Sequence, residues 1–554
     1  MPNSSRVPLL AAVALVLAGC ADPAPAAPPG LERYYAQRLD WGPCAPSGSD
    51  SGDRTEPALQ CARLEVPLDY AAPDGRRASI AVARRPAGGE RTGALVVNPG
   101  GPGDSGLELA ATLPDDLARS GLELADFDVV GFDPRGVGSS VPSIDCDTDA
   151  AIDADRADAD YDPSPAGVAR DEKRAAARAR RCAERSGGAD VLAHAGTRDV
   201  VRDLDVLRSA LGERGLTYLG YSYGTRIGAG YARRFPDRVR AMVLDGAFDP
   251  EQGTADRAVK QAAGFQRSFQ AYADGCVRAP ACPLGTDRTR ATAAFQALTR
   301  PLITRPARVP GDRRGLSYSD AVTGTEAALY DSEDWPKLTA GLAGLRAGNG
   351  AILLRLADRY YGRSPDGGYG GNSAEAQLVI NCLDSDRRAD RAAEAAKARR
   401  VAAAAPFADP GRGASGARGT CAFLPAAPAE PGDPLSGPAP AARPPVLVVS
   451  TTGDPATPYQ AGVALAAGLH ATLLTVVGDR HTAVAAGLPC VDAAVVGYLR
   501  RPGDPVTTSR CGATGSAPSA ASASADAEST GRSASTGESA STDPEPVAAT
   551  PRPR

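Results

Sequence analysis

A serine flanked by glycines is the strongest chemical signal in the sequence. The segment LGYSYGT at 219–225 contains the pattern G-x-S-x-G as Gly220, Ser222 and Gly224. It follows a predicted strand and opens a predicted helix, and in that context a sharp turn exposes the serine hydroxyl at the end of the strand. The flanking residues have to be glycine because a Cβ would clash in so tight a turn. We predict that Ser222 is a nucleophile; a structural Gly-Ser-Gly turn is the alternative.

A serine hydroxyl becomes a good nucleophile when a neighbouring base takes its proton. The chain has 3 histidines that could do so. His194 lies upstream of Ser222 and away from any strand end, and His470 precedes a strand, where it caps a helix or lies at the surface. His481 follows that strand, in GDRHTA, on a loop at the same edge of the sheet as Ser222. We predict that His481 is the base; an exposed loop histidine is the alternative.

The histidine in turn needs a carboxylate that holds its ring. Asp454, in STTGDPATP, directly follows a predicted strand, one strand before His481. Asp479 is a competitor, but it is badly placed to reach a ring two residues further on. Asp384, in NCLDS, is a second competitor with a weaker strand context. The order Ser, Asp, His, each at the C-terminal end of a strand, is typical of one class of serine hydrolase. We predict that Asp454 orients His481.

A glycine-rich loop, NPGGPGDSG at 98–106, follows the first of the predicted strands. Such a loop leaves backbone N–H groups free to bind the oxyanion of an acyl-transfer reaction. We expect donors from Gly101, with Gly100 as the alternative, and from Tyr223, the residue after the nucleophile. A phosphate-binding loop is excluded because the required lysine and spacing are missing. GFDPRGVGSS at 131–140 is interpreted as a structural turn that braces the serine turn.

Buried strands alternating with helices must position these residues. Six Val/Leu-rich runs, each ending in Gly or Asp or at the serine turn, predict parallel strands covered on both faces: 94–101, 127–133, 216–222, 239–246, 444–454 and 471–478. Helices are predicted at 197–212 and 224–234. Between about 250 and 440 the pattern changes to helix-like segments at 254–275, 334–347 and 386–404, with no clear strand. The sequence predicts an α/β fold with a mostly parallel sheet and an inserted helical cap at 250–440, between sheet-domain parts at 40–249 and 441–511.

The ends of the chain point to export. Arg6, a short apolar run and LAGC at 17–20 predict a lipoprotein signal peptide over residues 1–20, in which Cys20 is lipidated and becomes the mature N-terminus. A plain secretory signal is the alternative. The residues that follow, 21–39, are predicted to be a linker, because ADPAPAAPPG opens them, and the Ser/Ala/Thr-rich residues 512–554 a disordered tail. We expect a protein on the outer face of the membrane, or a secreted one.

Cysteine usage agrees with an oxidising compartment. Of the 11 cysteines, all but Cys20 can pair with one another, and none has zinc spacing with nearby histidine. Sequence does not fix the pairing, but neighbouring pairs are favoured: Cys44–Cys61, Cys146–Cys182, Cys276–Cys282, Cys382–Cys421 and Cys490–Cys511. A formal net charge of -5 without basic runs argues against nucleic acid as a partner. We expect no metal or cofactor, and a monomer that contacts the membrane only through its anchor.

Taken together, these motifs resemble the prolyl aminopeptidase family, and more closely the secreted tripeptidyl aminopeptidases of actinobacteria, which have the α/β-hydrolase fold. The resemblance covers about residues 40–511 and is carried by NPGGPG, GFDPRGVGSS, GYSYGT, VLDG, NCLD and GDPATP. It implies a serine exopeptidase that removes short peptides, tripeptides in the tripeptidyl aminopeptidases, from free N-termini through an acyl-enzyme. It also implies that cap carboxylates bind the substrate amine; the candidates are Glu326, Glu333 and Asp334, with Asp331 beside them. A solvated helix end is the alternative for this cluster.

One residue departs from the family pattern. Relatives commonly have glycine before the catalytic histidine, whereas this chain has Arg480. Two other functions therefore stay open. An esterase or lipase could use the same residues, because fold and triad do not set the substrate. A non-catalytic binding lipoprotein could have kept the fold.

Overall fold

The computed structural model describes residues 27–44, 59–158, 161–249, 251–385, 389–425 and 445–512. The predicted signal segment with Cys20, and residues 513–554 of the predicted tail, lie outside these ranges. Within the described ranges, no helix is long and apolar enough to cross a membrane.

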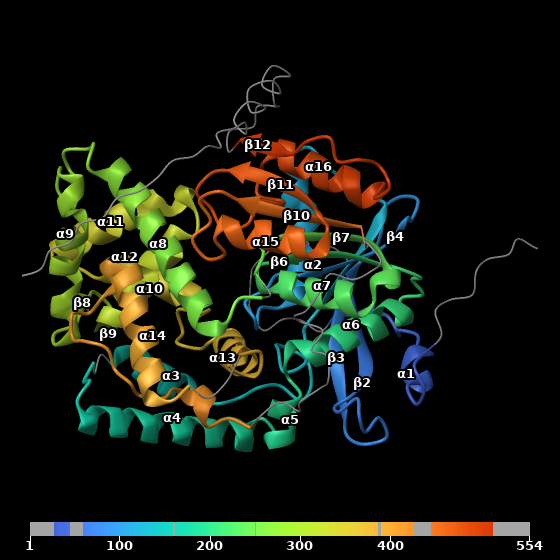
Figure 1. Ribbon diagram of the computed structural model, residues 1–554, viewed down its shortest axis with the longest axis horizontal. Coiled ribbons are helices and arrows are strands. Elements are labelled where there is room, and N and C mark those ends of the chain that lie inside the picture. Colours follow the sequence, from blue (N-terminus) through green and yellow to red (C-terminus); the bar gives the residue numbers. More distant parts are fainter. Residues whose placement is uncertain are drawn as a thin grey trace, which may run out of the picture. The chain divides into compact units, whose positions relative to one another are not determined.

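The described residues form a ten-stranded sheet in the order β1-β2-β3-β5-β4-β6-β7-β10-β11-β12 (Figure 1). The first strands pair antiparallel, and every pair from β5 to β12 is parallel. The strands are β1 (Gly42–Pro43), β2 (Gln60–Pro67), β3 (Arg77–Arg85), β4 (Gly93–Asn98), β5 (Phe127–Phe132), β6 (Leu216–Tyr221), β7 (Val239–Asp245), β10 (Val446–Thr451), β11 (Thr472–Val477) and β12 (Arg510–Gly512). The predicted mostly parallel sheet and its six predicted strands are confirmed; β1, β2, β3 and β12 were not predicted.

Helices cover both faces of the sheet because the central strands are apolar at every position. All residues of β4, β5, β6 and β10 are buried. Along β4, Val96 packs on one side while Leu95 and Val97 pack on the other. The first side carries α6 (Thr197–Ala210), α7 (Tyr223–Arg234) and α15 (Tyr459–Leu469), and the second carries α2 (Gly106–Ala118) and α16 (Pro489–Arg500). Since all the parallel strands point the same way, their C-terminal ends meet at one edge.

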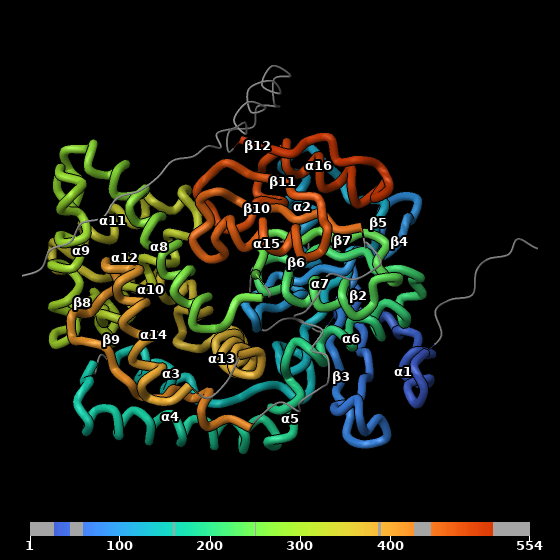
Figure 2. The backbone as a smooth tube through the Cα atoms, viewed as in Figure 1, coloured from blue at the N-terminus to red at the C-terminus, as the bar shows by residue number. Residues whose placement is uncertain are grey.

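The cap is built from residues between β7 and β10. The chain leaves the sheet after β7 and returns to it at β10, which pairs with β7 (Figure 2). The cap has its own apolar core, in which the Phe269 ring stacks on Phe407 at 4.9 Å and meets Phe295 at 5.2 Å. Its helices are α8 (Thr254–Cys276), α9 (Ala291–Thr299), α10 (Tyr318–Leu329), α11 (Trp335–Arg346), α12 (Ala351–Tyr360) and α14 (Arg391–Ala404).

Three features of the cap differ from the contiguous helical insertion predicted over 250–440. A short hairpin, β8 (Ala307–Val309) with β9 (Asp312–Leu316), lies within it. The helix α13 (Ser373–Leu383) packs its Val379 and Ile380 into the core of the sheet domain. Conversely, α3 (Asp149–Ala157) precedes the cap in sequence and joins it, because Arg156 is bound to Asp320 on α10. The boundary between the sheet domain and the cap is set by these contacts between residues far apart in the sequence, and the composition of the chain does not reveal them.

The linker predicted over 21–39 ends earlier than expected. Residues 32–35 form the short helix α1 (Glu32–Tyr35), and Tyr34 and Tyr35 are buried in the core of the sheet domain. The Tyr35 hydroxyl donates to Asp205 Oδ2 at 2.6 Å on α6. Two neighbouring tyrosines thus fix this part of the chain to the fold, and the Pro/Ala-rich composition ahead of them concealed it.

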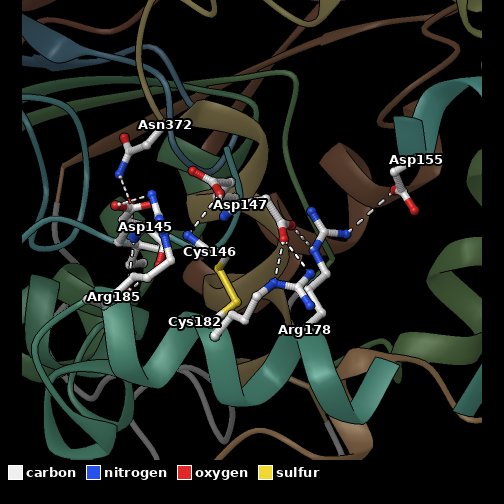
Figure 3. Close-up of a disulfide and its surroundings, with 12 residues drawn as sticks. Asp145, Cys146, Asp147, Asp155, Arg178, Cys182, Arg185 and Asn372 are labelled. Carbon is white, nitrogen blue, oxygen red and sulfur yellow. Dashed lines mark hydrogen bonds and ion pairs between the residues drawn. A yellow bond between two sulfur atoms is a disulfide. The ribbon is translucent and has the colours of Figure 1, made fainter. Parts of the chain in front are cut away.

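All five predicted disulfides are present: Cys44–Cys61, Cys146–Cys182, Cys276–Cys282, Cys382–Cys421 and Cys490–Cys511. Cys146–Cys182 joins the segment after β5 to α4 (Pro165–Arg185), and Asp147 beside it is bound by Arg178 (Figure 3). The short helix α5 (Ala189–Ala193) follows α4. Cys490–Cys511 fastens the three-residue strand β12 to the first turn of α16. The bridges therefore connect the less regular parts of the chain to the sheet domain and the cap.

Candidate active site

Ser222 occupies the sharp turn between β6 and α7. Its backbone has φ 51° and ψ -119°, a region that L-residues rarely adopt, and its N–H donates to the Asp245 carbonyl at 2.8 Å. A Cβ on Gly220 would lie 2.6 Å from the Gly224 carbonyl, and one on Gly224 would lie 2.8 Å from the Asn98 carbonyl. The glycines of the motif are thus required by close backbone packing, as predicted.

His481 and Asp454 are in direct contact. The His481 Nδ1 atom lies 2.9 and 3.0 Å from the two carboxylate oxygens of Asp454. Asp454 is buried and also accepts bonds from the N–H groups of Ala456 and Thr457 and from the Thr457 hydroxyl, at 2.8–3.0 Å. Each oxygen of the carboxylate therefore has fixed donors, which orient it toward the imidazole.

The charge around His481 favours its protonated form. Burial lowers the pKa of the imidazole, but attraction to the Asp454 carboxylate, their hydrogen bond and attraction to Asp245 together raise the pKa above 6.5. Such an environment suits a base that must accept a proton from a hydroxyl and carry it as a cation for part of the reaction.

Asp245 is a buried carboxylate that motif reasoning did not assign. It ends β7, the strand between those that lead to Ser222 and Asp454, and it is fully buried. Its Oδ2 accepts the N–H groups of Ala483 and Val484, at 2.7 and 2.8 Å, and so holds the loop after His481. Burial raises the pKa of Asp245 to about 6 despite these bonds. The sequence pattern that could have identified Asp245 is an aspartate at the C-terminal end of a predicted buried strand, at the same edge of the sheet as Ser222.

The glycine-rich loop lies against the serine turn. Gly100 has φ 106°, and a Cβ there would lie 2.6 Å from the Tyr221 carbonyl and 3.0 Å from the Ser222 Cβ. Gly101 lines the same cavity as Ser222, and its carbonyl accepts a bond from Gln377 Nε2 at 3.2 Å. Tyr223 follows Ser222 at the start of α7 and is buried. It stays a prediction that an oxyanion would bind to N–H groups of Gly101 or Gly100 in this loop and of Tyr223 at the start of α7.

The turn at 131–140 braces this loop more directly than it braces the serine. Asp133 Oδ1 accepts the Ser105 hydroxyl at 2.7 Å and the Gly106 N–H at 3.1 Å, and so holds the start of α2. Arg135 is buried and donates to both oxygens of Asp203 on α6, at 2.6 and 2.7 Å. The structural role expected for this motif is thus observed, on the side of the glycine loop and α6.

Ser222 and His481 open into one cavity of about 690 Å³, between the sheet edge and the cap. The cap contributes an aromatic wall to it, in which the Tyr330 ring meets the His481 ring edge-on at 5.4 Å and the Tyr360 ring at 6.2 Å. Two carboxylates, Asp104 and Glu108, also line the cavity from the sheet side. The volume suits a small-molecule substrate or a few residues of a peptide.

Comparison with known proteins assigns the family. A model of the alpha/beta hydrolase fold matches residues 93–485, more than half of the chain. The chain belongs to the α/β-hydrolase family.

Three similar proteins carry names that state an enzymatic activity. The chain is 44% identical over 512 residues to "Serine protease Hip1" of Mycobacterium tuberculosis, covering 91% of this chain and 96% of that protein. It is 45% identical over 478 residues to "Carboxylesterase B" of the same species, covering 86% and 90%. It is 31% identical over 476 residues to the "Tripeptidyl aminopeptidase" of Streptomyces lividans, covering 83% and 84%.

The competing residues lie elsewhere in this α/β hydrolase. The Asp384 carboxylate accepts the Thr197 N–H at 3.0 Å at the start of α6. Asp479 lies beside Gly453, where a Cβ would be 2.3 Å from its Oδ1. His194 is near Asp199, with Nδ1 3.4 Å from Oδ2, and His470 is exposed at the end of α15. None of these four residues is among those that line the catalytic cavity.

The cap carboxylates predicted to bind an amine are not gathered at the cavity. Asp334 is bound to Lys337 and Arg359, and Glu333 is exposed. Glu326 lines a second cavity of about 670 Å³, whereas its neighbour Ala327 lines the catalytic one, so α10 separates the two. Burial raises the pKa of Glu326 to about 7. The structure therefore does not bring the three predicted ligands together, and the carboxylates it does place in the catalytic cavity were missed.

Proposed function

We propose that this α/β hydrolase is an exported serine exopeptidase that releases short peptides, tripeptides foremost, from free N-termini. The observation that carries the proposal is the cavity shared by Ser222 and His481, which the cap covers and which contains the carboxylates of Asp104 and Glu108. A site partly covered by a cap favours chain ends as substrates, and a negative wall attracts a protonated amine.

The proposed reaction uses the side chains already described. His481 takes the proton of the Ser222 hydroxyl, and the oxygen attacks the scissile carbonyl to form a tetrahedral oxyanion, which N–H groups of the glycine loop and Tyr223 stabilise. Asp454 holds the imidazole and stabilises its cationic form. The imidazolium then protonates the leaving amine, which departs with its peptide chain. Water, activated by His481, hydrolyses the acyl-enzyme and restores Ser222.

Recognition of the amine is the step that would separate an exopeptidase from other hydrolases. Asp104 directly precedes the N-cap of α2 and Glu108 lies in its first turn, and both line the cavity. The Asp104 carboxylate also accepts the Ser373 hydroxyl at 2.6 Å. Arg359 is the only lysine or arginine among the described residues that line the cavity, and its guanidinium is bound to Asp334. The free charge of the cavity is therefore negative. A role for Glu326 from its own cavity stays a prediction.

The relatives support two substrate classes. The Hip1 serine protease and the tripeptidyl aminopeptidase favour peptides, and the carboxylesterase B favours an ester-cleaving enzyme as the second candidate. Both reactions pass through the same acyl-enzyme, so the triad cannot distinguish them.

The test is hydrolysis of chromogenic mono-, di- and tripeptides, each with a free and a blocked N-terminus, beside ester substrates. We expect cleavage of free tripeptides that is lost on blocking and in Ser222→Ala. Asp104→Asn and Glu108→Gln should raise KM for free peptides about tenfold or more, as loss of a charge-assisted hydrogen bond does. Glu333→Gln is the matched control, since that exposed carboxylate does not line the cavity. If the protein cleaves esters but no peptide, it is an esterase and the exopeptidase proposal is wrong.

Export is proposed from the cysteines. The described residues hold five disulfides, which form and persist in oxidising compartments. Lipidation of Cys20 and attachment to the outer face of the membrane remain part of the proposal; metabolic labelling with a fatty acid, lost in Cys20→Ala, would test them.

A further inference from the structure

The loop that carries His481 is paired with the cap through its backbone. Residues 330–332 of the cap, which connect α10 to the short helix η4 (Ser332–Asp334), run antiparallel to residues 479–481. The His481 N–H donates to the Tyr330 carbonyl at 2.7 Å, and the Ser332 N–H donates to the Asp479 carbonyl at 3.1 Å. The backbone of His481 is therefore hydrogen-bonded directly to the cap.

An ion pair fastens this short pairing at its centre. Arg480 Nη2 donates to Asp331 Oδ2 at 2.7 Å, and the two side chains are only 16% and 27% exposed. The other oxygen of Asp331 accepts the Glu333 N–H at 3.0 Å, which fixes the carboxylate. Partial burial and a fixed acceptor make such a pair stronger than an exposed one.

The loop needs such external contacts because its own backbone is strained. Thr482 and Ala485, just after the histidine, have φ 63° and 60°, which non-glycine residues adopt only where surrounding contacts impose it. On that side, Asp245 binds the N–H groups of Ala483 and Val484. On the N-terminal side of the strained residues, residues 330–332 of the cap hold the loop through their hydrogen bonds to residues 479–481.

We propose that Arg480 and Asp331 are positioning residues, whose ion pair locks the cap segment 330–332 onto the histidine loop and so aims the His481 imidazole at Ser222. The inference rests on the proposed roles of Ser222 and His481 as nucleophile and base. It gives Arg480 a function: the arginine couples the cap to the base, and it is not among the residues that line the cavity. Small displacements of a catalytic group reduce rates steeply, so loss of the pair should slow the chemical step.

The experiment measures how fast a small fluorophosphonate labels Ser222, a reaction that needs His481 but no peptide specificity. Arg480→Ala and Asp331→Ala should each slow labelling about tenfold, with little change in KM for a short acetate ester. The double variant should be no slower than either single one, because the two residues act as a unit. Arg480→Lys should restore part of the rate. Arg76→Ala is the matched control, since its 2.6 Å pair with Asp190 is half exposed and remote from the loop.

Labelling of folded Arg480→Ala at the wild-type rate, or losses that add in the double variant, would overturn the proposal. Melting curves establish folding, and if Arg480→Ala does not fold, Asp331→Asn takes its place: it keeps an acceptor, removes the charge and should also slow labelling. A wild-type rate in that variant would be equally decisive against the pair. If the wild-type protein is labelled but cleaves no free peptide, the exopeptidase proposal is wrong, whereas the proposed role of the ion pair is unaffected.

Discussion

The sheet edge and the cap hold their side chains in place by different physical means. At the sheet edge, single side chains are fixed by nearby backbone: Ser222 by a strained turn, and Asp454 by the N–H groups that follow it. In the cap, long charged side chains reach partners far away in the sequence. Arg156, for example, binds Asp320 at 2.9 Å and Asp358 at 2.7 Å from a helix that precedes the cap by about a hundred residues.

This difference indicates which part performs chemistry and which part tolerates change. A functional group fixed by local turns keeps its geometry when distant residues vary, whereas a network of ion pairs changes when any member does. We therefore expect substitutions at the sheet edge to remove activity without unfolding the protein. Substitutions in the cap should act first on stability and substrate access, with Asp331, which contacts the histidine loop, as the exception.

The largest effect should come from Asp454→Asn. The amide keeps an oxygen that can accept the Ala456 and Thr457 N–H groups, so the fold should remain, but it no longer stabilises the cationic imidazole or fixes its tautomer. We expect kcat to fall by about 10⁴ with an unchanged melting temperature. Asp479→Asn, on the loop of His481 but beside Gly453, should keep most of the activity. Comparable losses in the two variants would contradict the assignment of Asp454.

The comparison also explains how far the sequence predicts this molecule. The parallel strands, the serine turn and the order Ser, Asp, His were accessible because each depends on a few consecutive residues. Cysteines that follow one another in the sequence also paired as expected, although up to 39 residues separate the two partners. Asp245 was missed because its importance lies in a contact with Ala483 and Val484, which come from the other side of the cap insertion.

The cap shows where local patterns stop being informative. Glu326, Glu333 and Asp334 look alike as an acidic cluster, yet they face a second cavity, solvent and a pair of cations, respectively. Which way a carboxylate points depends on helix packing between segments distant in the sequence. Tyr34 and Tyr35 similarly looked like linker residues until their packing on α6 was known.

An intermediate effect is expected from Arg156→Met in the cap. The guanidinium is 5% exposed, and its removal leaves the carboxylates of Asp320 and Asp358 without this partner. Breaking a buried pair in this way costs about 3–5 kcal/mol of unfolding free energy. Arg400→Met, whose 2.5 Å pair with Asp256 in the same cap is half exposed, should lose less than about 1 kcal/mol.

Hydrogen exchange would locate the loss caused by Arg156→Met. Because the cap has its own apolar core, exchange should accelerate in α10 and α12 while β6 and β10 stay protected. Equal acceleration in the sheet would show that the sheet domain and the cap unfold as one unit. The two regions would then differ in their catalytic roles but not in their stability.

The smallest effect, and the sharpest test of the sheet edge, is a pH shift in Asp245→Asn. His481 must be neutral to accept the serine proton, and its raised pKa moves the acidic limb of kcat/KM to a higher pH than an unperturbed histidine would give. Asp245 contributes to that rise, so replacing its charge should move the limb to lower pH, while the amide oxygen can still accept the Ala483 and Val484 N–H groups.

The shape of the profile should change as well. Asp245 itself has a pKa raised to about 6, so in the wild type two interacting groups titrate together and the limb should be shallow. With asparagine, one group remains and the limb should steepen to a single ionisation. Asp492→Asn is the matched control: this buried carboxylate accepts the Ala485 N–H at 2.7 Å in the same loop, but its charge is not among those that raise the histidine pKa. An equal shift in both variants would mean that loop geometry, and not the charge of Asp245, sets the pKa of the base.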